Sequence, residues 1–287
     1  MRPVTKFRLF RLLRSLVITY VLLCAIVGVF QRRIIYFPFY KTEAGMLAKA
    51  TELGCQPWRA PDGKIIGWTR PHHGPPAANR LVLFHGNAGY ALMRTHYIPG
   101  FEQLGGGRLW EVYLFEYPGY GARSGKLGQE SFIAASSQAI DALQAADSRP
   151  IYLLGESLGS GPASALAQRR PKDVAGLFLL TPYARLGDVA ARRFGFLPVR
   201  MMLRDPWDNL TALHDYRGAM AMLIAGEDEV VTAAQGHLLF DSYTGPKRLW
   251  TDPGATHNTV NFSPYAPWWG DVSDFLLDDT RPRLSSP

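Results

Sequence analysis

The feature that most constrains how this chain can fold is the stretch of residues 149–166, which reads RPIYLLGESLGSGPASAL. Four apolar residues after a proline, a Gly-x-Ser-x-Gly motif and a run of helix formers predict a strand, a sharp turn and a helix. Ser157 would lie on the turn, and Gly155 and Gly159 would be needed because strand and helix approach too closely there for a Cβ atom. The free N–H groups that open the helix, including that of Leu158, would point at the same place. The stretch therefore predicts an exposed serine nucleophile beside half of an anion site.

Runs typical of buried strands alternate with helical patterns along the remaining chain. Strands are expected near residues 80–84, 109–115, 174–182, 220–226 and 247–250, helices over 130–146 and 267–277, and a hairpin between Trp58 and Trp68. This alternation predicts an α/β fold with a mostly parallel central sheet and helices on both faces, with ligands at the carboxyl ends of the strands. Residues 42–287 are a normal length for one such domain.

A second motif, HGNAG at residues 85–89, follows the strand expected at 80–84. A glycine-rich turn at a strand end can aim a backbone N–H at the oxyanion that forms during acyl transfer. The expected donor is the N–H of Asn87, paired with the N–H of Leu158. Gly86 suits the turn, and His85 is expected to brace the loop by hydrogen bonding and not to transfer protons.

Four strings together resemble one protein superfamily: QRRIIYFP at 31–38, HGNAG at 85–89, YPGYG at 117–121 and GESLGSG at 155–161. They are similar to the α/β-hydrolases, and within them to the membrane-anchored bud-emergence-type and serine-aminopeptidase-like hydrolases. The resemblance covers nearly the whole chain after residue 30. It implies an α/β-hydrolase fold and a catalytic triad in the chain order serine, acid, histidine.

The resemblance assigns the other two triad members. Asp228 follows the strand expected at 220–226 and matches the family's Asp-x-x-Val pattern, while its neighbour Glu227 is a second candidate. His257 follows the last expected strand in the string DPGATHN. The implied mechanism needs no metal and no organic cofactor, and neither cysteine has the spacing of a metal ligand.

The N-terminal segment, residues 1–41, carries eight basic side chains and no acidic one, so the rest of the chain sums to −1 of the total +7. The basicity flanks an uncharged apolar run at 15–31, which argues against a nucleic-acid groove. We expect an uncleaved transmembrane signal anchor, with a cleaved signal peptide or a helix buried in the domain as alternatives. Five cations precede the run and three follow it, which favours a cytoplasmic N-terminus and an extracytoplasmic catalytic domain.

These features predict a membrane-anchored serine hydrolase, esterase- or lipase-like, that cleaves a carboxylic ester or thioester of a small acyl or lipid substrate. A peptidase or amidase using the same triad and a non-catalytic binding protein of the same fold are the alternatives. Residues 183–216 either form an apolar cover over the pocket or simply connect two strands.

Overall fold

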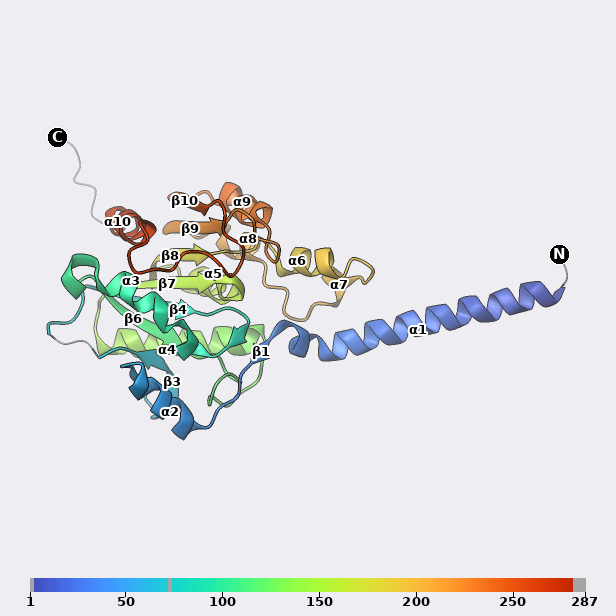
Figure 1. The fold of residues 1–287 in the computed structure, drawn as a ribbon, viewed down its shortest axis with the longest axis horizontal. Coiled ribbons are helices and arrows are strands. Elements are labelled where there is room, and N and C mark those ends of the chain that lie inside the picture. The colour runs from blue at the N-terminus through green and yellow to red at the C-terminus, as the bar shows by residue number, and fades with distance from the viewer. Residues whose placement is uncertain (1–2, 72–73, 281–287) are drawn as a thin grey trace.

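The computed structural model describes residues 3–71 and 74–280, and its centre is a twisted eight-stranded sheet (Figure 1). The strand order is β10-β9-β8-β7-β4-β6-β3-β2, with β3 antiparallel to its neighbours and all other adjacent pairs parallel. The strands are β2 (Gln56–Arg59), β3 (Ile65–Thr69), β4 (Asn79–Phe84), β6 (Trp110–Phe115), β7 (Ile151–Glu156), β8 (Val174–Leu180), β9 (Ala219–Ala225) and β10 (Lys247–Asp252). A separate parallel pair joins β1 (Phe37–Pro38) to β5 (Ala88–Gly89).

Helices cover both faces of this sheet, because successive residues of each central strand point to opposite sides. On β4, Leu81 and Leu83 enter one apolar core while Val82 and Phe84 enter the other. The first core is closed by α2 (Glu43–Glu52), α3 (Ile98–Glu102) and α10 (Trp268–Thr280), and the second by α4 (Gln129–Ala146), α5 (Ser160–Arg169), α8 (Asn209–Leu213) and α9 (Ala233–Ser242). The predicted mostly parallel sheet with helices on both faces is confirmed.

Residues 183–216 contain three short helices, α6 (Leu186–Arg193), α7 (Val199–Met202) and α8. The last of these packs against α5 and belongs to the domain. In contrast, α6 and α7 extend beyond the sheet on the side from which the N-terminal helix leaves (Figure 1). The segment is therefore more than a single connecting helix and loop.

The N-terminal helix α1 (Pro3–Ile35) projects away from the domain (Figure 1). Its stretch Phe7–Ile35 has 29 residues and contains an 18-residue window with a mean hydropathy of 2.3, and by length and composition it could cross a membrane. At 1.5 Å per residue it spans about 43 Å, more than the roughly 30 Å of a bilayer core. The helix is thus longer than the run expected at 15–31. The alternative of a helix buried in the domain is wrong, because none of its most apolar window is buried.

The carboxyl end of α1 is fixed to the segment that contains α7. Gln31 donates its side-chain N–H to the carbonyl of Met202 at 3.0 Å. Arg32 forms two hydrogen bonds, of 2.8 and 2.9 Å, with the carboxylate of Asp205, whose side chain is almost fully buried. These contacts hold the last turns of α1 against the domain at the carboxyl-end edge of the sheet.

Candidate active site

The turn after β7 places Ser157 at the carboxyl edge of the sheet in a left-handed conformation, with φ of 51°. The two glycines of the motif allow the close crossing that this turn requires. A Cβ on Gly159 would lie 1.9 Å from the carbonyl oxygen of Phe84, and one on Gly155 would lie 2.7 Å from the carbonyl oxygen of Gly159. Because real Cβ atoms do not approach backbone so closely, only glycine fits at either position.

Three side chains predicted from separate parts of the sequence meet at this turn. The Oγ of Ser157 lies 2.8 Å from Nε2 of His257, and Nδ1 of His257 lies 2.6 Å from Oδ2 of Asp228. An ionised carboxylate accepts from Nδ1–H, so the lone pair of Nε2 faces the serine hydroxyl. This arrangement gives a hydroxyl, a base and an orienting acid in sequence.

The structure joins Asp228, and not Glu227, to the histidine. The Asp228 side chain is buried, and its second oxygen accepts the backbone N–H groups of Val230 and Val231 at 2.8 and 2.7 Å. Glu227 is exposed. These two backbone donors fix the position of the Asp228 carboxylate beside His257.

Asn87, in the loop after β4, is held in place by three hydrogen bonds. Its carbonyl oxygen accepts the N–H of Phe37 at 2.9 Å and the hydroxyl of Tyr120 at 2.7 Å, and its side-chain amide donates to the carbonyl of Ile35 at 3.3 Å. Within the part of the chain that the structure describes, the backbone N–H groups of Asn87 and Leu158 have no hydrogen-bond partner. Both groups thus remain available to a ligand.

His85 is fully buried behind this loop. Its Nδ1 lies 2.8 Å from the carbonyl oxygen of Gly86, its own carbonyl accepts the hydroxyl of Tyr117 at 2.9 Å, and its ring packs against those of Tyr117 and Tyr120. Its contacts are those of a residue that braces the loop.

Sequence reasoning missed an ion pair beneath the site. Arg94, in the short helix η1 (Ala91–Tyr97), binds both carboxylate oxygens of Glu156 at 2.7 and 3.0 Å. Burial opposes ionisation of Glu156, but the guanidinium holds the pKa of that carboxyl below its usual range. A Cβ on Gly86 would lie 3.1 Å from the same carboxylate. The ion pair therefore connects the turn that carries Ser157 with the loop that carries Asn87. Glu156 lies within the Gly-x-Ser-x-Gly motif, but its partner Arg94 is 62 residues away in the sequence. No local sequence pattern predicts that Arg94 pairs with it.

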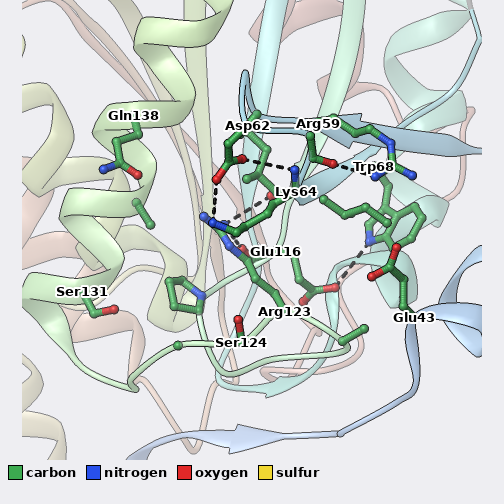
Figure 2. Close-up of a pocket in the computed structure, with 18 of the residues that line it drawn as sticks. Glu43, Arg59, Asp62, Lys64, Trp68, Glu116, Arg123, Ser124, Ser131 and Gln138 are labelled. Carbon is green, nitrogen blue, oxygen red and sulfur yellow. Dashed lines mark hydrogen bonds and ion pairs between the residues drawn. The ribbon is translucent and has the colours of Figure 1, made fainter.

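A hollow of about 730 Å³ lies between the β2–β3 hairpin, the turn after β6 and α4 (Figure 2). Its charged groups largely satisfy one another: Lys64 pairs with Asp62 at 2.6 Å, and Glu116 accepts the indole N–H of Trp68 at 3.4 Å. No triad member lines this hollow. This hollow is therefore separate from the site that contains Ser157.

Comparisons with known proteins agree with this architecture. A family model described as the alpha/beta hydrolase fold matches residues 79–213. An uncharacterized protein of Mycobacterium tuberculosis is 29% identical over 242 residues, which cover 79% of this chain and 80% of that protein. Human alpha/beta hydrolase domain-containing protein 17B is 29% identical over 192 residues, covering 65% of this chain and 62% of its own length.

Among solved structures, an esterase of Pyrococcus furiosus superposes with a TM-score of 0.61 at 17% identity, covering 85% of this chain and 98% of its own. The chain has the α/β-hydrolase fold, as predicted. The narrower bud-emergence and serine-aminopeptidase likeness stays a prediction.

Proposed function

We propose that this protein is a membrane-anchored serine hydrolase that cleaves a carboxylic ester or thioester. The observation that carries the proposal is the unbroken hydrogen-bonded chain from Ser157 through His257 to Asp228. The esterase among the structural neighbours is consistent with it.

In this mechanism Nε2 of His257 takes the proton of the Ser157 hydroxyl as Oγ attacks the carbonyl carbon of the substrate. The N–H groups of Asn87 and Leu158 stabilise the oxyanion, and each such donor contributes about 3 kcal/mol. His257 then protonates the leaving alcohol or thiol, and an acyl-serine remains. Water, activated by the same imidazole, releases the acid and restores the serine. Asp228 keeps the ring in the required tautomer and stabilises its cationic form.

The proposal places α1 across the membrane as an uncleaved anchor. Its length and hydropathy suit a span, and the excess of cations before it favours a cytoplasmic N-terminus with the domain outside. The direct contacts of Gln31 and Arg32 with the domain support retention of the end of the helix, because cleavage after them would remove part of the folded structure.

The test is a panel of short p-nitrophenyl esters, thioesters and aminoacyl amides, assayed with the full chain in detergent. We expect ester and thioester turnover that falls by about 10³-fold or more in Ser157→Ala. Ser124→Ala, at an exposed serine outside the triad, is the matched control and should leave turnover unchanged. A clear preference for the amides would instead indicate a peptidase or amidase. Turnover equal in wild type and Ser157→Ala would indicate a binding protein.

A further inference from the structure

A small apolar cavity lies between the end of α1 and the α6–α7 segment, which we define as residues 186–203. It has a volume of about 70 Å³ and is walled by Val27, Ile34 and Ile35 on one side and by Ala190, Phe194 and Met202 on the other. This volume accommodates a short length of a hydrocarbon chain and not a whole lipid. A longer chain would continue along the exposed apolar flank of α1.

One wall residue of this cavity, Ile35, contacts the loop that carries Asn87. The carbonyl of Ile35 accepts the side-chain amide of Asn87 at 3.3 Å, and Asn87 carries a proposed oxyanion donor. The side chain of Ile35 packs against the same apolar core that contains Leu158, the residue after the proposed nucleophile. A hydrocarbon chain in the cavity would therefore end close to where an ester carbonyl must lie.

The outer end of the α6–α7 segment lies beside the apolar stretch of α1. The hydroxyl of Tyr20 donates to the carbonyl of Phe196 at 3.0 Å. Tyr20 is 15 residues before the end of α1, a distance of about 22 Å along a helix. Figure 1 shows α6 and α7 extending in the same direction as α1. If α1 spans a bilayer, the carbonyl of Phe196 lies at the depth of Tyr20, near the middle of Phe7–Ile35.

The surface of the segment suits that location. Phe196 is 65% exposed and Met201 90% exposed, although both are large and apolar. The segment carries three arginines, Arg192, Arg193 and Arg200, and one acid, Asp188, which pairs with Arg200 at 2.8 Å. Exposed apolar residues at the tip and arginines around them are typical of segments that enter the headgroup region of an anionic membrane.

We propose that the α6–α7 segment is immersed in the leaflet beside α1, and that the cavity between them takes the acyl chain of a lipid ester from the bilayer to Ser157. This inference rests on the proposed serine hydrolase function and names its substrate class. The ester carbonyl is attacked by Ser157, the lipid alcohol leaves with a proton from His257, and water releases the fatty acid. The reacting ester thus never has to leave the membrane as a free lipid.

The first experiment compares two substrates of the full chain reconstituted in vesicles of phosphatidylcholine and phosphatidylglycerol. One is soluble p-nitrophenyl butyrate, and the other is 4-methylumbelliferyl palmitate embedded in the vesicles. In the double variant Phe196→Asp with Met201→Asp, hydrolysis of the embedded ester should fall by about tenfold or more, because charges oppose entry into the leaflet. Hydrolysis of the soluble ester should stay within about twofold of wild type.

Tyr265→Asp is the matched control, because Tyr265 is 87% exposed and lies on a loop tied to Gln103 beside α3, away from α1. It should change neither rate. A second variant, Ala190→Phe, fills the cavity and should shift the preferred acyl chain toward shorter lengths.

Three results would overturn the inference while leaving the hydrolase intact: wild type cleaves only the soluble ester, the double variant lowers both rates equally, or Ala190→Phe leaves the chain-length profile unchanged. Failure of the proposed function is a different result. It would appear as butyrate hydrolysis by wild type no faster than by Ser157→Ala.

Discussion

At Ser157 the backbone adopts a φ of 51°, a conformation that costs a non-glycine residue about 1–2 kcal/mol. The strand before Ser157 and the helix after it fix this backbone conformation. The Ser157 hydroxyl is therefore already oriented toward His257. The neighbouring acid is held in the same way, since two backbone N–H groups bind the Asp228 carboxylate. Individual residues in this site are oriented by backbone hydrogen bonds and close packing.

Replacement of Asp228 tests this orientation. In Asp228→Asn the amide cannot act as an anionic acceptor for Nδ1–H, so the tautomer that exposes the Nε2 lone pair is lost. We expect kcat for ester hydrolysis to fall by about 10³- to 10⁴-fold with little change in KM. Glu227→Gln removes the adjacent exposed carboxylate and should leave kcat within about twofold. Equal losses in the two variants would contradict the assignment of the acid.

The ion pair between Arg94 and Glu156 predicts a pH dependence of stability. In the folded protein the pKa of Glu156 is lower than its unfolded value of about 4.3. The ion pair therefore contributes its full stabilisation of the fold above that pH, and this contribution is lost as the pH falls through the folded pKa. In Glu156→Gln the buried guanidinium is left unpaired, which should cost about 3 kcal/mol at pH 7 and lower Tm.

Thermal unfolding in detergent at pH 7 and pH 3.5 provides the measurement. The difference in Tm between wild type and Glu156→Gln should shrink at the lower pH, because the contribution of the ionised pair declines as the pH falls below the unfolded pKa of Glu156. A difference that is the same at both pH values would show that the pair does not titrate as described.

At the scale of elements, the strand, turn and helix around Ser157 could be predicted because their determinants are local. The motif, the proline before it and the helix formers after it all lie within 18 residues. The strands β4, β6, β8, β9 and β10 were likewise predicted from short apolar runs. The partner of Glu156 and the contacts of the Asn87 loop could not be predicted, since they join residues dozens of positions apart through side chains with no local pattern.

The crossing of strand and helix at Gly159 provides a test at this scale. Gly159→Ala would place a methyl group 1.9 Å from a backbone carbonyl of β4, which cannot move without breaking the sheet. We expect a loss of more than about 3 kcal/mol, or failure to fold, measured as a fall in Tm and in soluble yield.

Gly270→Ala is the control, because Gly270 lies within α10 and a Cβ there would meet nothing within 4 Å. It should stabilise the protein by about 0.5–1 kcal/mol through helix propensity. Similar stability of Gly159→Ala and wild type would contradict the close crossing.

At the scale of the whole molecule, the carboxyl edge of the sheet, the end of α1 and the α6–α7 segment lie on one side of the domain (Figure 1). The sequence predicted α1 as a hydrophobic helix but not its attachment to the domain. That attachment depends on Gln31 and Arg32 reaching Met202 and Asp205, about 170 residues later in the chain. The projection of α6 and α7 beside α1 could not be predicted for the same reason.

The arrangement predicts an orientation in the membrane. Alkaline phosphatase fused after Pro287 should be active in intact bacteria, and a fluorescent protein fused before Met1 should fluoresce, because the proposed orientation puts the domain outside and the N-terminus inside. Replacing the five cations that precede the apolar run with neutral residues should lower the phosphatase activity. An inactive phosphatase fusion in a stable, membrane-bound chain would contradict this orientation.

The proposed hydrolase mechanism requires Ser157 to act as a nucleophile that is activated by His257. The measurement is mass spectrometry of the full chain after incubation with a fluorophosphonate probe, followed by peptide mapping. We predict a single adduct on the peptide that contains Ser157, absent from Ser157→Ala and formed at least about 10³-fold more slowly in His257→Ala. A folded wild-type protein that forms no adduct, or forms it equally fast without His257, would contradict the account.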